Sequence, residues 1–252
     1  MPRPTSGGVA ARQTSVKFAF QPIGIIHSCF PEKFGIPRQP GLVKEARATL
    51  ELLPPYDRSE ALEGLEAFSH LWLIFVFHAS LKEAWKATVR PPRLGGNKRV
   101  GVFASRSMFR PNPIGLSVVE VERIDTSARP PCLYLKGVDL LDGTPVLDIK
   151  PYLPYVDAIS SAHGGYAATS PELRLQVNFT SAAVAQCASY AESYPQLEAL
   201  ITQVLALDPR PAYYGDDQGR TEFGMRLLEF EVKWRVEGEQ VNVLAIEKAV
   251  WE

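Results

Sequence analysis

Short apolar runs separated by proline and glycine fill the first two thirds of the chain, where long amphipathic helical stretches are missing. Short runs rich in β-branched and aromatic residues between such breakers are typical of strands. Most of these runs follow each other closely, which favours antiparallel pairing, because a parallel sheet needs crossover helices. The region is therefore predicted to be all-β and barrel-like, with strands at residues 20–28, 48–53, 71–77, 99–104, 116–124, 132–138 and 146–149.

The composition changes after Asp157, where residues 158–165 are small and rich in glycine, as linkers are. Beyond this stretch, apolar and polar residues alternate over 173–179, which predicts a half-buried strand. They alternate again over 228–236, before a last strand. We predict a mainly β chain with a flexible leader (1–15), a β-barrel domain (16–157), a linker (158–170) and a small C-terminal α+β domain (171–252).

Two helices are predicted between these late strands. Thr180 or Ser181 is placed to cap the first helix, which continues to about residue 194. Pro195 opens a second helix that runs to residue 207, and Pro209 ends it. The tail therefore combines helices with strands and differs in class from the barrel that precedes it.

The composition is that of an ordinary soluble globular protein, with 252 residues, 46% of them hydrophobic, and a formal charge of -1. No apolar run approaches the roughly 20 residues that a membrane-spanning helix needs. The leader carries arginines but no apolar core, unlike a secretory signal, so we expect a cytoplasmic protein. The three cysteines form no CxxC pair, which argues against a disulfide framework or a zinc site and favours buried thiols.

Missing motifs exclude several common enzyme classes. The sequence has no GxGxxG after a strand, no GxxxxGKS/T, no GxSxG and no HExxH. His70 and His78 share one face of a predicted strand, but no acidic residue or cysteine accompanies them on it, so we predict no metal site. We expect a structural role for His70. His78 ends the most hydrophobic run, at the rim of the barrel, and there packing and function are equally open.

A basic segment lies between Glu83 and Glu120, where no acidic residue occurs. In a chain that is neutral overall, this asymmetry predicts a positive field that attracts phosphate-rich partners, although a solvated loop without any partner has the same composition. Pro91-Pro92 and the run Arg110-Pro111-Asn112-Pro113 stiffen the backbone, which holds the cations at defined places and favours binding. The cations of the segment are Lys86, Arg90, Arg93, Lys98, Arg99, Arg106 and Arg110.

Two other loops combine a rigid backbone with a few polar groups, at residues 35–41 and 139–145. The first contains Arg38, and arginine suits forked contacts with phosphate or carboxylate. The second contains Asp142-Gly143, a common hairpin signal, so a plain turn is as plausible there as a binding loop.

Several of these segments together resemble one family. The segments 22–24, 35–39, 68–78, 101–106, 110–116 and 139–152 closely resemble the TsaA-like family, and the likeness extends to residues 208–213 and the late strand of the tail. The resemblance implies a β-barrel with an appended C-terminal domain, a homodimer, and a tRNA partner. It also implies an activity, the transfer of a methyl group from S-adenosylmethionine to N6 of N6-threonylcarbamoyladenosine next to the anticodon.

Site residues follow from the resemblance position by position. It implies binding of S-adenosylmethionine by Pro37, Arg38, Gln39, His78, Ala79, Arg106, Leu116, Asp139, Leu140, Leu141 and Asp142. RNA binding is assigned to the cations Lys86, Arg90, Arg93, Lys98, Arg99, Arg110 and Arg210, and to Tyr213. The sequence departs from many members at Ala79, where they have Gln, and at Ser105 and Met108, where they have Thr and Pro. Any contact at Ala79 is therefore through the backbone or through packing.

The catalytic chemistry leaves alternatives open. The acylated N6 must lose a proton during or after attack, and either His78 or Asp142 is a candidate to accept it. Either Arg38 or Arg106 is a candidate to bind the threonyl carboxylate. Two other functions remain open. A non-catalytic RNA-binding module of the β-barrel class would use the same cations. A hydrolase or methyltransferase that acts on a free acidic metabolite would need the arginine pair but not the spread of cations from Lys86 to Arg110.

Overall fold

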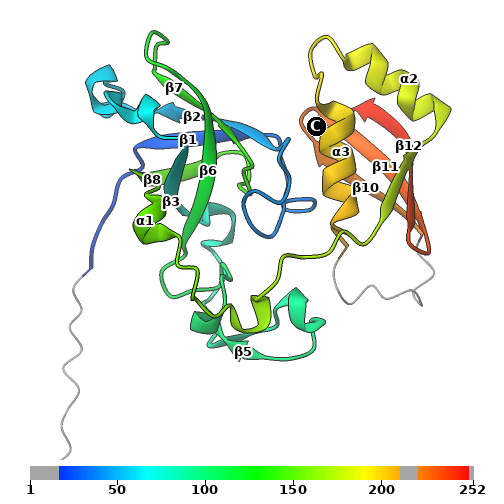
Figure 1. The fold of residues 1–252 in the computed structure, drawn as a ribbon, viewed down its shortest axis with the longest axis horizontal. Helices are drawn as coiled ribbons and strands as arrows, with labels where there is room; N and C mark the ends of the chain where they lie inside the picture. Colours follow the sequence, from blue (N-terminus) through cyan, green and yellow to red (C-terminus); the bar gives the residue numbers. More distant parts are fainter. Residues whose placement is uncertain (1–16, 211–220, 250–252) are drawn as a thin grey trace, which may run out of the picture.

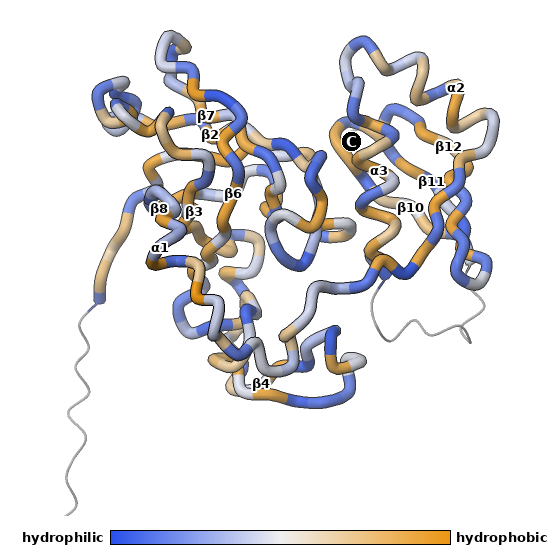
Figure 2. Tube along the Cα trace, viewed as in Figure 1, coloured by the Kyte–Doolittle hydropathy of each residue, from blue (hydrophilic) through white to orange (hydrophobic). Residues whose placement is uncertain are grey.

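The computed structural model describes residues 17–210 and 221–249, so the predicted leader at residues 1–15 lies outside the described part of the chain. Figure 1 shows two bodies, a barrel and a sheet covered by helices, with the loop between β1 and β2 reaching from the first toward the second. Hydrophobic residues recur along the strands of both bodies, between hydrophilic loops (Figure 2). None of the helices among the described residues is long and apolar enough to span a membrane.

The predicted barrel is confirmed, and it is closed. Neighbouring strands pair antiparallel all the way round, in the order β1-β2-β7-β6-β3-β8 with β8 returning to β1. Because the order differs from the sequence order, the loops that meet at one end come from distant parts of the chain. The strands are β1 (Gly24–Ser28), β2 (Arg47–Leu52), β3 (His70–Val76), β6 (Ile114–Asp125), β7 (Cys132–Lys136) and β8 (Thr144–Pro151).

The two-residue alternation of the sequence fills the barrel. On β3, Leu71, Leu73 and Phe75 are buried, and the residues between them are not. Gly115 on β6 pairs with Phe75, and a Cβ at this glycine would lie 2.2 Å from the ring atom Cζ. Only glycine therefore lets the ring occupy this part of the interior, and the same alternation turns Ser117 inward and Leu116 outward.

The connection from β3 to β6 contains short elements rather than the predicted strand at 99–104. Only Val100–Gly101 is extended there, as β5, and it pairs with β4 (Thr88–Val89). The next three residues form a 3-10 turn, η5 (Val102–Ala104), because both the amide and the hydroxyl of Ser105 donate to the carbonyl of Val102. The other turns before β6 are η1 (Ser59–Leu62), η2 (Leu65–Ala67), η3 (His78–Ser80) and η4 (Pro92–Leu94).

The C-terminal body is a four-stranded sheet with order β10-β11-β12-β9 and two helices. Thr180 caps the first helix, since its Oγ1 accepts a hydrogen bond from the amide of Ala183 at 3.2 Å. That helix ends earlier than predicted, and the strand β10 was missed. The elements are β9 (Gln176–Phe179), α2 (Ser181–Tyr190), α3 (Leu197–Ala206), β10 (Glu222–Leu227), β11 (Phe230–Glu237) and β12 (Gln240–Lys248).

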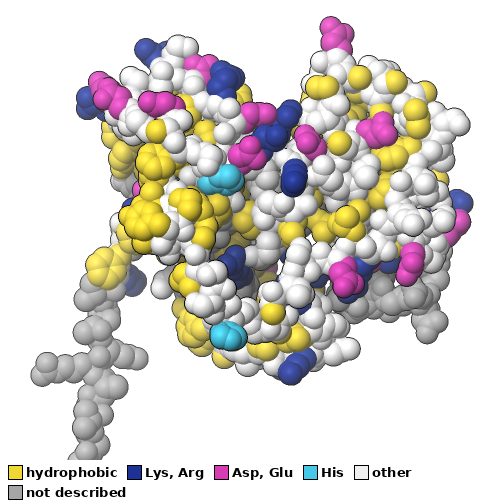
Figure 3. All heavy atoms as spheres, viewed as in Figure 1, with side chains coloured by type: hydrophobic (Ala, Val, Ile, Leu, Met, Phe, Trp, Pro, Cys, Tyr) yellow, Lys and Arg dark blue, Asp and Glu magenta, His cyan; other side chains and the backbone are white. Residues whose placement is uncertain are grey.

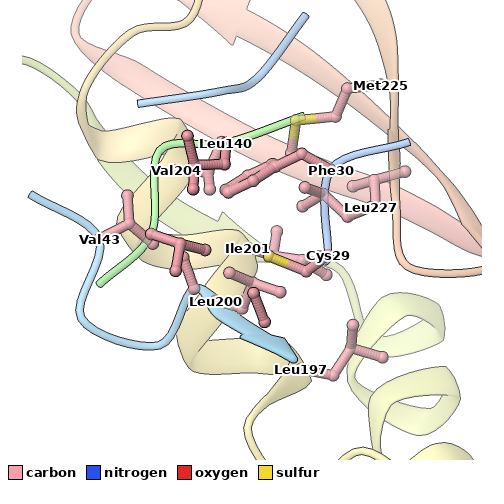
Figure 4. Packing of buried hydrophobic residues seen from close by; sticks show 14 of the residues in the cluster. Cys29, Phe30, Val43, Leu140, Leu197, Leu200, Ile201, Val204, Met225 and Leu227 are labelled. Atoms are coloured by element: carbon pink, nitrogen blue, oxygen red, sulfur yellow. The ribbon is translucent and has the colours of Figure 1, made fainter. Parts of the chain in front are cut away.

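The two bodies share one hydrophobic core, through the connection between β1 and β2. Cys29, Phe30 and Val43 of that connection pack with residues of α3 and β10, as the close view in Figure 4 shows. Backbone hydrogen bonds add to this contact, since the amide of Leu228 donates to the carbonyl of Cys29 at 2.9 Å. The residues labelled on the C-terminal side are Leu197, Leu200, Ile201, Val204, Met225 and Leu227.

The segment predicted to be a linker contacts the basic segment. It follows α1 (Pro154–Asp157) and contains the 3-10 turn η6 (Gly165–Ala167). The hydroxyl of Tyr166 donates to the carbonyl of Ala104 at 3.1 Å, and the guanidinium of Arg93 donates to the carbonyl of Thr169. The predicted limits of this linker and of the two domains stay a prediction.

Candidate functional site

Four segments that are distant in sequence are joined by hydrogen bonds at one end of the barrel. The connection after β1 supplies two of the links. Arg106 Nη1 donates to Gln39 Oε1 at 2.5 Å, and Lys33 Nζ donates to the carbonyl of Ala79 at 3.2 Å and to the hydroxyl of Ser80 at 3.1 Å. The connection after β1 is therefore tied both to the turn η3 and to the loop that precedes β6.

The turn between β7 and β8 is held against the end of β1. The amide of Ser28 donates to Asp142 Oδ1 at 2.9 Å, and the hydroxyl of the same serine donates to the carbonyl of Leu140 at 2.7 Å. In return, the amides of Asp142 and Gly143 donate to β1 and the residues after it, at 2.8 Å each. The sequence left open whether residues 139–145 form a plain turn. These bonds tie the turn to β1 and to the residues that follow it.

Asp139 places a carboxyl group at this end of the barrel in largely apolar surroundings. It lies between Val138 and Leu140, both of which are fully buried or nearly so. Burial raises the pKa of the Asp139 carboxyl to about 6, while a hydrogen bond from Ser117 and the positive charge of Arg106 act in the opposite direction. Ser117 Oγ donates to Asp139 Oδ1 at 2.7 Å. The carboxyl therefore changes its charge close to neutral pH.

His78 lies in η3 beside the turn between β7 and β8. Its Nε2 is 4.0 Å from the point where a Cβ on Gly143 would lie. Burial lowers the pKa of His78, the nearby ammonium of Lys33 lowers it further, and the carboxylate of Asp142 acts against both. A histidine whose pKa lies below its usual value is neutral at pH 7 and can accept a proton.

Arg38 faces the C-terminal body. Partial burial lowers the pKa of its guanidinium. The carboxylate of Asp208 raises this pKa, and the charge of Arg174 lowers it. Asp208 also binds Arg210 through two hydrogen bonds, from Nε at 2.7 Å and from Nη2 at 2.9 Å. Both of these side chains are largely buried, so this pair is a fixed part of the junction between the two bodies.

The basic segment contains two kinds of cation. Some of them hold the loop together, since Arg110 Nη1 donates to the carbonyl of Ser105 at 2.7 Å and Lys86 Nζ lies 3.9 Å from the centre of the Phe109 ring. Arg90 and Lys98 are exposed, as are Arg93 and Arg99, which also bond to neighbouring loops. Tyr213 lies outside the described residues.

Not every predicted residue joins the cluster. Leu116 is 51% exposed on the outer face of β6, beside Ile114, and thus on the opposite face of the strand from Ser117. Leu140 is buried in the core rather than open at the surface. His70 is exposed, hydrogen-bonds with the hydroxyl of Ser69, and its ring is tilted against that of Tyr152; its structural role stays a prediction.

Sequence reasoning missed three polar residues that build the site, Lys33, Ser80 and Ser117. Lys33 comes just before the rigid loop at 35–41, and this position next to a predicted binding loop could have identified it as a site residue. The two serines gave none, because a serine next to apolar strand residues is common. What distinguishes Ser80 and Ser117 is their burial, at 5% and 2% exposed, which only the fold reveals.

Figure 3 shows charged side chains of both signs at the notch between the two bodies, and hydrophobic side chains on the left side of the barrel. Within residues 17–210 and 221–249, no group of three or more His, Cys, Asp and Glu is arranged to hold a metal ion. A separate hollow on the C-terminal sheet, lined by Gly224, Lys233 and Leu244 among others, shares no residue with the four joined segments. It lacks the groups that the resemblance implies, so the end of the barrel is the candidate site.

Comparisons with known proteins agree with this architecture. Residues 25–158 match the model of the tRNA-methyltransferase O N-terminal domain, and residues 172–249 match that of the TrmO C-terminal domain. The tRNA (adenine(37)-N6)-methyltransferase of Escherichia coli (strain K12) is 49% identical over 231 residues, which cover 91% of this chain and 98% of the relative. A putative S-adenosylmethionine-dependent methyltransferase RcsF of Pseudomonas aeruginosa is 52% identical over 214 residues, 84% of this chain and 90% of that relative.

A solved structure extends the likeness to three dimensions. The crystal structure of TrmO from Pseudomonas aeruginosa superposes with a TM-score of 0.76 at 43% sequence identity, and it covers 92% of this chain and 98% of its own. Both domain models, relatives of nearly full length and a solved structure thus agree over the barrel and the tail. The chain belongs to the tRNA-methyltransferase O family.

Proposed function

We propose that this protein is an S-adenosylmethionine-dependent tRNA methyltransferase that modifies N6 of N6-threonylcarbamoyladenosine at position 37. Membership of the family and the printed activity of the relative from E. coli support this function. The observation in the chain itself that carries it is the hydrogen bond between Arg106 and Gln39. It joins two of the segments that the family resemblance assigns to the cofactor, although 67 positions separate them in the sequence.

The polar groups at the end of the barrel fit S-adenosylmethionine. This molecule has a carboxylate, an ammonium group and ribose hydroxyls, and when bound it supplies a methyl group on a positively charged sulfur. Arg106 and the amide of Gln39 suit the carboxylate, while Asp139 and Asp142 suit the hydroxyls or the ammonium. Ala79 has no side-chain amide and its carbonyl already accepts from Lys33, so its contribution is confined to the backbone and to packing.

His78 is favoured over Asp142 as the acceptor of the N6 proton. The two groups lie close enough for the charge of one to affect the pKa of the other. Asp142 Oδ1 already accepts from the amide of Ser28, which fixes it as a structural group. His78 is neutral at pH 7 because burial and Lys33 lower its pKa, so its free imidazole nitrogen can take the proton.

Substrate recognition is assigned to the arginines and the basic segment. Arg38, which is exposed at the junction of the two bodies, or Arg106 binds the threonyl carboxylate. The exposed cations Arg90 and Lys98 bind phosphates of the anticodon stem-loop, and the exposed rings of Trp85 and Phe103 are available for stacking with bases. Arg110 bonds within its own loop and contributes to RNA binding chiefly by holding that loop in shape.

We further propose a homodimer and a cytoplasmic location, as expected from the family resemblance and from the tRNA substrate. Support for the dimer comes from the outer face of β6, where Ile114 and Leu116 expose 41% and 51% of their surface next to each other. Exposed aliphatic side chains in adjacent positions are typical of protein interfaces.

The substrate class is tested with purified protein, S-adenosylmethionine and two tRNAs that differ only in the threonylcarbamoyl group. We expect methylation of the modified tRNA and turnover at least about 100-fold lower on the unmodified one, because the unmodified adenosine lacks the carboxylate that an arginine binds. Mass spectrometry of the digested nucleosides measures the product. Equal methylation of both tRNAs, or of neither, would contradict the proposed substrate.

The proton acceptor is tested by His78→Ala and Asp142→Asn. We expect His78→Ala to lower kcat by about 100-fold or more even at saturating S-adenosylmethionine, so the loss exceeds any change in cofactor affinity. In the wild type, kcat falls as pH drops through the pKa of His78, which lies below 6.5. His70→Ala serves as the control, since this histidine is exposed at the start of β3 and lies outside the four joined segments. If His78→Ala and Asp142→Asn both keep the wild-type kcat, neither group is the base.

Phosphate contacts are tested by the salt dependence of tRNA binding. We expect Arg90→Ala and Lys98→Ala each to reduce the slope of log K against log salt by about 0.7–0.9, because each lost phosphate contact releases one counterion fewer. Lys248→Ala is the control, since its ammonium pairs with Glu229 at 3.0 Å on the C-terminal sheet. Slopes equal to that of the wild type mean that these two cations point away from the RNA.

A further inference from the structure

Ser117 is a buried hydroxyl on the inner face of a mainly apolar barrel. It is 2% exposed and pairs across the sheet with Leu73, which is fully buried. Its neighbours that share the inner face of β6 are Gly115 and Val119. A hydroxyl in such surroundings costs free energy unless it forms a hydrogen bond. Ser117 forms that bond with Asp139, at 2.7 Å.

The bond joins β6 to the turn that follows its neighbouring strand β7. Asp139 is partly buried, and burial has the largest influence on the pKa of its carboxyl. The charged side chain that acts on it is Arg106, whose guanidinium is itself bound to Gln39. Ser117 is thus the side chain that donates directly to this carboxylate, and it holds one of its two oxygens, Oδ1.

We propose that Ser117 is a positioning residue for the methyl donor, because its hydroxyl fixes one oxygen of Asp139 and leaves the other to accept from a hydroxyl or ammonium group of S-adenosylmethionine. The inference rests on the proposed function. Ser117 does not touch the donor and acts through Asp139. The assignment of residues 139–142 to the cofactor does not include Ser117, which lies on the strand β6. The role of its hydroxyl is therefore a separate inference.

Loss of the hydroxyl has two effects on the carboxyl group. The first is orientation, because Ser117 is the side chain that bonds to Oδ1, and the other hydrogen bond to the carboxyl comes from the backbone of Asp139 itself. The second is charge. Burial already raises the pKa of Asp139 to about 6, and the bond from Ser117 lowers it. Without that bond the pKa rises further, so a larger fraction of the carboxyl is protonated at pH 7 and fewer molecules bind the donor.

The test is calorimetry of S-adenosylhomocysteine binding to the full chain at several pH values between about 5.5 and 8.5. We expect Ser117→Ala to weaken binding about 10-fold at pH 7, the size of one hydrogen bond to a charged group. Binding should weaken as pH falls through the pKa of Asp139, and in Ser117→Ala this midpoint should move up by about one pH unit. Ser117→Thr retains the hydroxyl and should restore both affinity and midpoint.

Thr180→Ala is the matched control, because it also removes a hydroxyl with a defined hydrogen bond, at the start of α2 and away from the site. It should leave affinity and midpoint unchanged. Wild-type affinity and an unchanged midpoint in a folded Ser117→Ala overturn the proposal. If that variant does not fold, Ser117→Cys replaces it, with the same expected losses, because a thiol is a much weaker donor.

A second measurement separates this proposal from the proposed function. Carbon NMR of the Asp139 carboxyl, assigned with Asp139→Asn, gives its pKa without any ligand. A higher pKa in Ser117→Ala supports the control of Asp139 by Ser117, and an unchanged pKa overturns it. A wild-type chain that does not bind S-adenosylhomocysteine overturns the role in donor binding together with the proposed function, whatever the carboxyl titration gives.

Discussion

The packing of the connection between β1 and β2 against the C-terminal domain is the contact on which the site depends. Phe30 is fully buried within this contact, and Gly35 lies against Met225 and Val204. The same connection carries Lys33 and the segment that ends with Gln39. Its apolar residues therefore fix the position of its polar ones, which links the tail domain to the chemistry at the end of the barrel.

The closed barrel supplies the second constraint, because it brings the ends of strands that are not consecutive in sequence to one place. Burial there has an electrostatic consequence. It raises the pKa of Asp139 and lowers that of His78, so one group changes charge near neutral pH and the other is neutral. In water, an aspartate is ionised and a histidine is mostly protonated at pH 6, so burial changes the charge of both groups at this pH. Shifts of this kind are typical of functional sites.

Local patterns predict much of this fold, since alternation identifies the barrel strands and Thr180 marks a helix start. The strand expected at 99–104 is wrong because the bonds of Ser105 to Val102 bend the chain, and such bonds have no hydrophobic pattern. The family resemblance supplied the proposed cofactor residues. It did not predict Ser117 or Lys33, whose roles depend on contacts between segments, nor that the side chain of Leu116 points away from the cluster.

Hydrogen exchange with and without S-adenosylhomocysteine tests most directly whether the distant segments form one binding site. We expect the ligand to slow exchange of backbone amides in all four of them, residues 33–39, 78–81, 105–107 and 139–143, while the sheet of β10, β11 and β12 exchanges as before. Protection confined to a single segment, or protection of the C-terminal sheet instead, would contradict a shared site at the end of the barrel.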